Sequence, residues 1–221
     1  MAEVKRIETG ISGLDKLIEG GLLENSVTLI SGNAGAGKTI LSMQFLKKGV
    51  EKKEKVLYIS TEETEDNIKD GFKILGWDLD KLKIDIMTLG PDELEEEWEP
   101  LLSNKIDKEK IKRIVIDSIS LASIYYRDEY STRKYIYKLI SSLKRRNITC
   151  LLTSEVPENE KALSKSGVEE FVCDGVILLQ FLGMGGKYER GLTVRKMRWT
   201  SHTQETHPYK IVKDKGIVLG K

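Results

Sequence analysis

The chain has 221 residues, of which 39% are hydrophobic and 32% are charged, with 36 Lys and Arg against 35 Asp and Glu. This composition excludes a disordered chain, which needs low hydrophobicity and unbalanced charge, and the length suits one compact domain over residues 1–221. The formal net charge of +1 excludes the strong overall basic field that nucleic-acid-binding proteins usually carry.

The apolar runs are far shorter than the about 18 residues that cross a bilayer, and the first residues do not form a signal peptide pattern. We therefore expect a cytoplasmic protein without a membrane span. Cys150 and Cys173 each lie in an apolar run, with no His or Cys at metal-ligand spacing. They are predicted to be small core residues rather than partners in a disulfide or a zinc site.

Six short runs rich in Val, Ile and Leu are bounded by turn residues or charges, which is typical of buried strands. In chain order they are Ser26 to Ser31, Lys55 to Ser60, Ile84 to Leu89, Arg113 to Asp117, Ile148 to Ser154 and Gly175 to Phe181. Helical patterns lie between them, most clearly in Ser131 to Arg146. Because the strands are continuously apolar, we predict an α/β fold with a mostly parallel central sheet flanked by helices on both faces.

The pattern changes after Phe181, where no helical stretch remains. Two turn clusters, Gly183 to Gly186 and Lys213 to Gly216, flank the apolar runs Leu192 to Arg198 and Tyr209 to Val212. This arrangement predicts C-terminal antiparallel β-hairpins that extend the sheet.

Residues 32–39, with the sequence Gly-Asn-Ala-Gly-Ala-Gly-Lys-Thr, match the P-loop pattern in full and lie between a predicted strand and a run compatible with a helix. In such a loop, backbone N–H groups surround phosphate oxygens at the positive end of a helix. Lys38 is expected to reach the β and γ phosphates, and the Thr39 hydroxyl to ligate Mg²⁺. The predicted nucleotide-binding residues are Asn33, Ala34, Gly35, Ala36, Gly37, Lys38, Thr39 and Ile40.

Hydrolysis needs a further Mg²⁺ ligand and a group that orients water, both expected where neighbouring parallel strands end. The apolar strand that ends at Asp117 has the Walker B arrangement, so Asp117 is predicted to hold Mg²⁺ together with Thr39. Another strand is followed by Glu62 and Glu63, and we interpret Glu62 as the base that activates water. The alternative is that both glutamates simply begin a helix, whose N-terminus favours carboxylates.

Two cations stand close together near the C-terminus. On the predicted strand Leu192 to Arg198, the two-residue period sends Lys196 and Arg198 to one face and Arg195 and Met197 to the other. Lys196 and Arg198 either belong to a solvated edge strand or neutralise a γ phosphate in the manner of an arginine finger. Their spacing leaves both interpretations open.

Together with further segments, these motifs resemble the KaiC-like branch of the RecA superfamily of ATPases over nearly the whole chain. The similar segments are Thr9 to Asp15 with Gly20-Gly21-Leu22 before the P-loop, Ser60 to Glu63, Gly167 to Phe171, Lys196 to Arg198, and Thr200 to His202. The segment that ends at Glu63 resembles the double-glutamate catalytic segment of the family, which implies catalytic roles for Glu62 and Glu63.

The resemblance implies a RecA-like P-loop NTPase core that assembles into a homo-oligomeric ring, usually a hexamer, with ATP between subunits. It implies that Lys196 and Arg198 approach the γ phosphate held by the neighbouring subunit, and that His202 and Asp214 approach its adenosine. The implied activity is slow, Mg²⁺-dependent hydrolysis of ATP. This hydrolysis is expected to drive or gate a conformational state that an unidentified regulatory protein partner recognises.

Two departures from the family pattern are informative. Trp199 stands where the family normally has Gly, and its ring either covers the base or packs; we expect packing. The phosphorylated domain of the family's clock protein has a Ser-Thr pair where this chain has Glu170 and Phe171. The chain therefore resembles the hydrolytic domain.

Two other functions remain as alternatives. A RecA or RadA paralogue that binds DNA in recombination or repair needs a basic, aromatic-lined path. The one basic cluster, Lys144 to Arg146, has an ordinary explanation at a helix end, so DNA is not the favoured partner. The third interpretation is a scaffold that binds ATP to assemble and hardly hydrolyses it, or an autokinase that uses another Ser or Thr.

Overall fold

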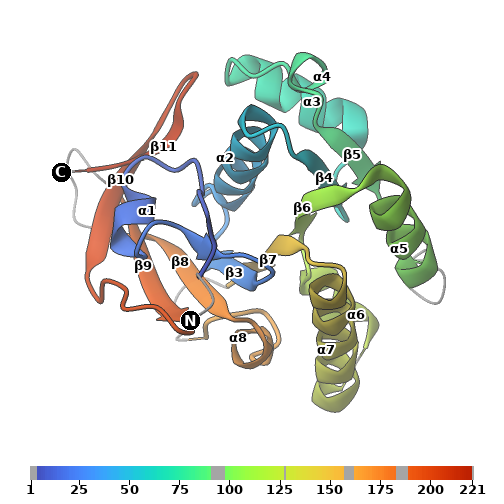
Figure 1. Cartoon of the computed structure of the whole chain (residues 1–221). Helices are drawn as coiled ribbons and strands as arrows, with labels where there is room; N and C mark the ends of the chain where they lie inside the picture. Colours follow the sequence, from blue (N-terminus) through green and yellow to red (C-terminus); the bar gives the residue numbers. More distant parts are fainter. Residues whose placement is uncertain (1–3, 91–97, 127, 157–161, 183–188, 221) are drawn as a thin grey trace.

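The structure is a computed structural model that describes residues 4–90, 98–126, 128–156, 162–182 and 189–220. Its main sheet has the strand order β11-β10-β9-β8-β3-β7-β6-β4-β5 (Figure 1). The strands are β3 (Val27–Gly32), β4 (Lys55–Ser60), β5 (Asp85–Thr88), β6 (Ile111–Asp117), β7 (Thr149–Glu155), β8 (Gly175–Phe181), β9 (Arg190–Met197), β10 (Thr206–Val212) and β11 (Gly216–Leu219). All six predicted strands are present, with small differences at their ends, and five are buried as predicted. The exception is β5, which is only partly buried because it lies at the edge of the sheet.

The pairing separates the sheet into a parallel part and an antiparallel part. Strands β8, β3, β7, β6, β4 and β5 are parallel to one another, whereas β9, β10 and β11 pair in antiparallel fashion. Figure 1 shows the antiparallel strands together at one side of the molecule. The predicted α/β class with C-terminal antiparallel strands is confirmed. The predicted turn Gly183 to Gly186 lies outside the described residues.

The helices follow the strands in alternation as far as β8. They are α1 (Leu14–Leu17), α2 (Lys38–Glu51), α3 (Glu65–Ile74), α4 (Leu79–Leu82), α5 (Trp98–Glu109), α6 (Ser120–Tyr125), α7 (Glu129–Arg145) and α8 (Glu169–Val172). The N-terminal strands β1 (Arg6–Ile7) and β2 (Leu22–Leu23) form a separate antiparallel pair that the sequence did not predict. Within the described ranges, no helix is long and apolar enough to span a membrane.

Apolar side chains cover both faces of the sheet. On β6, Val115 joins the core formed with α2, α3 and α4, whereas Ile114 and Ile116 join the core formed with α5 and α7. This two-sided burial explains why the parallel strands are continuously apolar. Cys150 and Cys173 are free thiols buried in the second core, as predicted.

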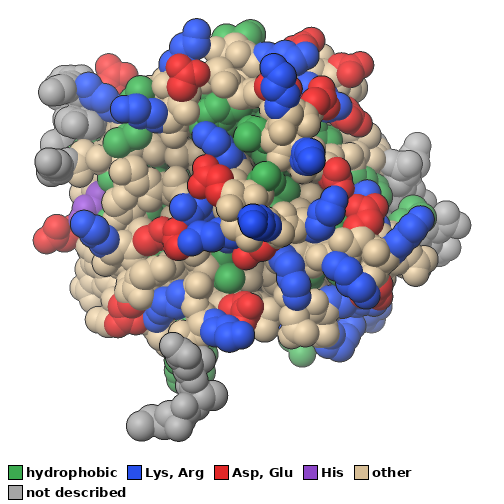
Figure 2. Space-filling view, turned by 45° about the horizontal axis from the view of Figure 1, so that its top comes forward, with side chains coloured by type: hydrophobic (Ala, Val, Ile, Leu, Met, Phe, Trp, Pro, Cys, Tyr) green, Lys and Arg blue, Asp and Glu red, His purple; other side chains and the backbone are tan. Residues whose placement is uncertain are grey.

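The outer surface mixes charges of both signs. On the face drawn in Figure 2, Lys and Arg side chains are interspersed with Asp and Glu rather than gathered into one basic patch. This distribution agrees with the formal net charge of +1.

The register brings the candidate functional residues to one edge of the sheet. Gly32 at the end of β3 lies beside Glu155 at the end of β7, and Ser60 at the end of β4 lies beside Asp117 at the end of β6. Because the four strands are parallel and adjacent, everything that follows them in the chain begins at the same edge. The P-loop and the Glu62 segment therefore start next to each other.

Arg113 is a buried charge that ties three parts of the fold together. The residue is 2% exposed and forms an ion pair with Glu54. Its Nη1 atom donates to the carbonyl oxygens of Glu8 at 2.7 Å and Phe45 at 3.1 Å. The N-terminal segment, α2 and β6 are thus linked through one guanidinium group.

We predict that Arg113→Ala lowers the free energy of unfolding by about 3 kcal/mol, because a carboxylate and two carbonyl groups lose their donor at a buried site. Urea unfolding followed by circular dichroism measures the change. Arg195→Ala is the control, because Arg195 is exposed and its loss is expected to change the free energy little. Equal losses in both variants would contradict the structural role of Arg113.

Candidate nucleotide site

The P-loop has the backbone geometry that a phosphate cradle needs. Gly35 and Gly37 have positive φ angles of 72° and 100°, where side chains other than glycine are strained. A Cβ on Gly32 would lie 2.1 Å from the carbonyl oxygen of Leu179, so no larger residue fits there. Gly37 caps α2 without a side-chain hydrogen bond, which leaves the N–H groups of the first turn directed at the loop.

A pocket of about 310 Å³ opens at this loop. It is lined by Ala34, Gly35, Gly37, Lys38, Thr39, Ile40, Glu62, Asp117, Ser118, Glu155 and Ile211. Two of the predicted P-loop residues do not line it. Ala36 is buried and its carbonyl oxygen accepts from the Tyr209 hydroxyl, and Asn33 donates to the carbonyl oxygen of Val156 at 3.3 Å. The pocket therefore gathers most of the predicted P-loop residues with Glu62 and Asp117.

Lys38 lies folded back against its own loop. Its Nζ atom donates to the carbonyl oxygens of Gly32 at 2.9 Å and Asn33 at 3.1 Å, and the residue is 9% exposed. Burial lowers the pKa of Lys38, an effect that is partly opposed by the carboxylates of the pocket, above all Glu155. A phosphate that enters the pocket offers this ammonium group a stronger acceptor than the two carbonyl groups.

Asp117 accepts hydrogen bonds from three hydroxyl groups. Thr39 Oγ1 at 2.7 Å and Tyr58 Oη at 2.6 Å donate to Oδ2, and Thr153 Oγ1 donates to Oδ1. Burial, reinforced by the neighbouring Asp117, raises the pKa of Tyr58 far above its ordinary value, so the phenol stays a donor. Sequence reasoning found Thr39 but missed Tyr58 and Thr153, because polar groups on a buried strand gain meaning only when the neighbouring strands are known.

These oxygen donors fit Mg²⁺. The cation prefers hard oxygen ligands and is usually held by one or two carboxylates, waters and substrate phosphates. The hydroxyl of Thr39 and the carboxylate of Asp117 form such a pair beside the phosphate loop. Among the described residues there is no cluster of three or more His, Cys, Asp and Glu side chains that could hold a metal ion.

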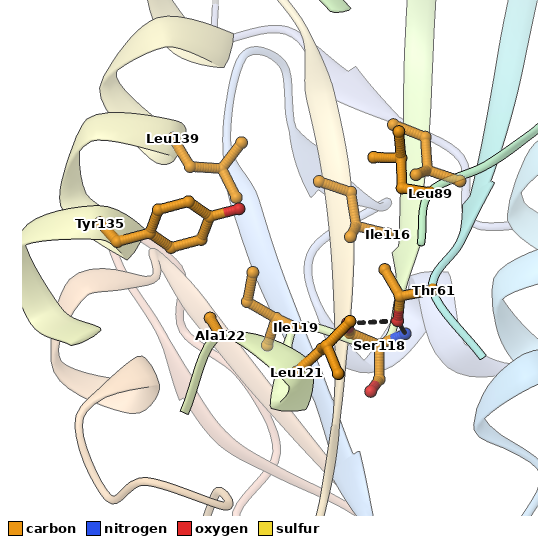
Figure 3. A pocket seen from close by; sticks show the side chains of 10 residues that line it. Thr61, Leu89, Ile116, Ser118, Ile119, Leu121, Ala122, Tyr135 and Leu139 are labelled. Atoms are coloured by element: carbon orange, nitrogen blue, oxygen red, sulfur yellow. Dashed lines mark hydrogen bonds between the residues drawn. The ribbon is translucent and has the colours of Figure 1, made fainter. Parts of the chain in front are cut away.

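Glu62 is held in the pocket by the residue that follows Asp117. The Ser118 hydroxyl donates to Glu62 Oε1 at 2.6 Å, and Ser118 also exchanges backbone hydrogen bonds with the Thr61 hydroxyl. Behind this segment lies an enclosed apolar cavity of about 10 Å³ between the strand ends and α7, which Figure 3 shows with Thr61 and Ser118 at its wall. The carboxylate of Glu62 is thus positioned by strand ends rather than by a free helix terminus.

Glu155 is an acidic residue of the pocket that sequence analysis did not single out. It ends β7 beside Gly32, and its backbone N–H donates to the Ser120 hydroxyl at 3.1 Å. The signal in the sequence was a strand that ends in a carboxylate, as β6 does. Without the strand order, nothing indicated that β7 lies between β3 and β6.

The second predicted glutamate faces a different cavity. Glu63 lines a pocket of about 190 Å³ with Asn67, Ile68 and Phe72, and this pocket shares Thr39 and Ile40 with the P-loop pocket. Its backbone N–H and C=O groups both bond to the Ser60 hydroxyl. Glu62 therefore lines the P-loop pocket, and Glu63 lines the pocket that adjoins it.

A comparison with family models identifies the chain. The model described as "ATPase: KaiC" matches residues 7–221. The chain belongs to the KaiC ATPase family. The family is one of nucleotide-binding proteins, in agreement with the P-loop geometry.

Similar proteins of this KaiC family occur in bacteria and archaea. A UPF0273 protein of Thermotoga maritima is 34% identical over 98% of this chain and 96% of its own length. The circadian clock protein KaiC3 of Synechocystis is 30% identical, but the chain covers 46% of it, about half its length. The crystal structure of a KaiC-like protein of Pyrococcus horikoshii superposes with a TM-score of 0.87 and 32% identity, over 99% of this chain and 100% of that one.

Lys196 and Arg198, which resemble a KaiC-family signature, point together but away from the P-loop of their own chain. Lys196 Nζ donates to the carbonyl oxygens of Glu170 and Cys173, both at 2.7 Å, and Arg198 Nη2 donates to that of Phe171 at 3.3 Å. Burial, and next the neighbouring Arg198, lower the pKa of Lys196. Neither side chain lines the P-loop pocket.

The strict alternation predicted for β9 is wrong at one position. Val176 of β8 pairs with Lys196, and Ile177 pairs with Val194, so this register shift leaves Arg195 out of the pairing. Arg195 is exposed, whereas Met197 is buried in the core. A bulge of this kind inserts one residue into the strand and breaks the two-residue period.

Three further residues of the KaiC resemblance also lie outside the P-loop pocket. His202 follows β9, with its Nδ1 atom 2.6 Å from the carbonyl oxygen of Thr203. Asp214 forms the β10–β11 turn with a φ of 64°, and its carbonyl oxygen accepts from Trp77 Nε1 at 2.9 Å. Trp199 is 88% exposed, so the expectation that its ring packs is wrong. The residue lies in the turn after β9 with a left-handed φ of 57°.

The lowered pKa of Lys38 predicts a pH effect on stability. Between that lowered pKa and the unfolded value near 10.5, the unfolded chain binds the proton more tightly, so the stability of the wild type rises with pH. Lys38→Met removes the buried charge, so its advantage in unfolding free energy over the wild type shrinks as pH rises toward 10.5. Chemical unfolding of both proteins at a series of pH values measures the difference.

The control for this experiment is Lys81→Met, because the Lys81 side chain is 85% exposed and its removal relieves no burial. An advantage of Lys38→Met that grows with pH would contradict the assigned sign.

Proposed function

We propose that this protein is a Mg²⁺-dependent ATPase, that its 221 residues form one ATPase unit, and that each active site is completed by a second copy of the chain. The observation that carries the proposal is the convergence of Lys38, Asp117 and Glu62 on one pocket at the P-loop. The three groups supply charge neutralisation, metal ligation and a carboxylate base, which together are what phosphoryl transfer to water needs.

Each residue of the pocket has a separate role in this proposal. Lys38 leaves the carbonyl oxygens of its loop for the β and γ phosphates. Thr39 and Asp117 hold Mg²⁺, which supplies further neutralisation of phosphate charge. Glu62 accepts a proton from the attacking water, in an orientation fixed by the Ser118 hydroxyl 2.6 Å away. Glu63 lines the adjoining pocket and supports this segment.

The adjoining pocket offers a place for the nucleoside. Its walls of Ile68, Phe72 and Leu75 are apolar, and Asn67 and Glu63 add polar groups. A nucleotide whose phosphates occupy the P-loop reaches this space past Thr39 and Ile40, which line both pockets. Contacts to phosphate do not select a base, and membership of the KaiC family supports ATP as the nucleotide.

The sheet register supports the proposal that a second copy completes the site. Gly175 pairs with Thr28 at the start of β3 and with Met197 at the end of β9, whereas the P-loop follows Gly32 at the other end of β3. Four residues of strand, about 13 Å, therefore separate Lys196 and Arg198 from their own phosphate loop. In our proposal they neutralise the γ phosphate of a neighbouring copy, and His202 and Asp214 approach its adenosine.

Contacts of this head-to-tail kind close into a ring when the rotation between copies allows it. We propose a homo-oligomeric ring, expected to be a hexamer as in the family resemblance, whose slow turnover gates a state that a regulatory protein recognises. The chain spans about half the length of the clock protein KaiC3, and the proposal therefore concerns an ATPase unit and not timekeeping.

One observation favours a second candidate function, the binding of single-stranded DNA. A groove of about 470 Å³ is lined by Tyr130, Arg133, Lys134, Tyr137, Phe171, Val172 and Arg198. Cations interleaved with exposed aromatic rings are the features that stack and neutralise a single strand. Salt-sensitive retention of single-stranded DNA by the wild type, lost in Tyr137→Ala, would support this function.

The main test measures Mg²⁺-dependent ATP hydrolysis per subunit over a wide range of protein concentrations. Glu62→Gln is expected to lower turnover at least about 100-fold, because it removes the base but keeps the phosphate contacts. Arg198→Ala is expected to be similarly impaired. An equal mixture of the two variants should recover activity, since some interfaces then combine an intact Glu62 with an intact Arg198.

The outcomes separate the parts of the proposal. Specific activity that rises with concentration, together with recovery in the mixture, supports a site shared between copies. Activity that is independent of dilution, with a mixture that stays inactive, rejects the role of Arg198 across the interface. ATP binding without any hydrolysis would instead favour the nucleotide-gated scaffold.

A further inference from the structure

Trp199 is a large apolar side chain whose exposure and backbone conformation are both unfavourable. It is 88% exposed, and in the described part of the chain it makes no hydrogen bond and no ring contact. Its φ angle of 57° lies in the left-handed region, which is unfavourable for a bulky residue and favourable for glycine. Neither packing nor backbone geometry within one copy explains a tryptophan here.

The surroundings of Trp199 have the composition of a binding surface. Its neighbour Arg198 lines the 470 Å³ groove, whose wall also contains Tyr130, Tyr137 and Phe171, with exposed fractions of 74%, 64% and 59%. Aromatic residues and arginine are enriched where proteins bind one another, and large exposed apolar groups that gather on one face indicate such a contact.

The position of Trp199 in the sequence limits the groups that its indole ring is expected to contact. Trp199 lies directly between Arg198 and the segment that ends at His202. In the function proposed above, Arg198 approaches the γ phosphate held by a neighbouring copy and His202 approaches the adenosine. In that proposal, Trp199 lies between the residue assigned to the γ phosphate and the residue assigned to the adenosine.

We propose that Trp199 stacks on the base of the purine nucleotide bound at the P-loop of the neighbouring copy. This inference rests on the proposed function and adds a residue that recognises the base. An indole ring and a purine both present flat π faces, and such stacking stabilises binding without hydrogen bonds. The base is then enclosed between the Phe72 pocket of one copy and the Trp199 ring of the next.

The first experiment uses energy transfer from tryptophan to ATP that carries an N-methylanthraniloyl group on its ribose. Trp77, which stacks on Phe72 of the nucleoside pocket, reports binding within one copy. The difference in transfer between the wild type and Trp199→Phe isolates the contribution of Trp199. We expect this difference to be present in concentrated protein and to vanish on dilution, while the Trp77 signal remains.

The second experiment compares stability with affinity. Trp199→Gly removes the ring and relieves the left-handed backbone, so its Tm is expected to equal or exceed that of the wild type. Its affinity for ATP in assembled protein is expected to fall about tenfold, as for the loss of one stacked base. Trp199→Phe is the matched control, because it keeps a stacking ring and most of the affinity.

Each outcome decides something different. If the wild type binds the labelled nucleotide but Trp199 contributes no transfer and Trp199→Gly keeps full affinity, this inference is wrong and the proposed ATPase stands. If Trp199→Gly loses assembly while monomers and assemblies bind ATP equally well, the ring contacts protein rather than the base, which also rejects it. If the wild type binds no nucleotide, the proposed function itself fails.

Discussion

The carboxylate of Asp117 is the point on which the candidate site depends. Hydroxyl groups from the first turn of α2, from β4 and from β7 all donate to it, so one side chain fixes the helix that follows the P-loop against two strands. Asp117 is partly buried, and its three donors stabilise the carboxylate because an unsatisfied charge away from water is costly. The same arrangement leaves oxygen atoms beside the phosphate loop, where the proposed Mg²⁺ would be held.

The register of the parallel strands brings the other pocket residues to the same edge of the sheet as Asp117. Because β3, β7, β6 and β4 are adjacent and end at one edge, the P-loop, Glu155, Asp117 and Glu62 meet there although the chain separates them widely. Strand β9 runs antiparallel to β8 and has the opposite effect. It carries Lys196 and Arg198 to the far end of the sheet, away from the P-loop of their own copy.

For two features, the surface geometry differs from what the sequence pattern predicted. The balanced charge, and a basic cluster that a helix end explains, argued against nucleic acid, yet α7 and α8 form a groove of exposed rings and cations. Trp199 stands where the resembled family normally has Gly, and the sequence analysis expected its ring to pack. In the structure it lies in a left-handed turn directly after Arg198, and its side chain is exposed.

The sequence alone determined the parts of this protein that depend on local pattern: the buried strands, the P-loop with its following helix, the Walker B aspartate and the family. These features follow from residue type and spacing along one segment. Only the tertiary structure decided that Tyr58 and Thr153 bond to Asp117, that Glu155 enters the pocket, and that Glu63 faces a different one. Such contacts depend on strand order and register, which local periodicity does not encode because any buried apolar strand can pair with any other.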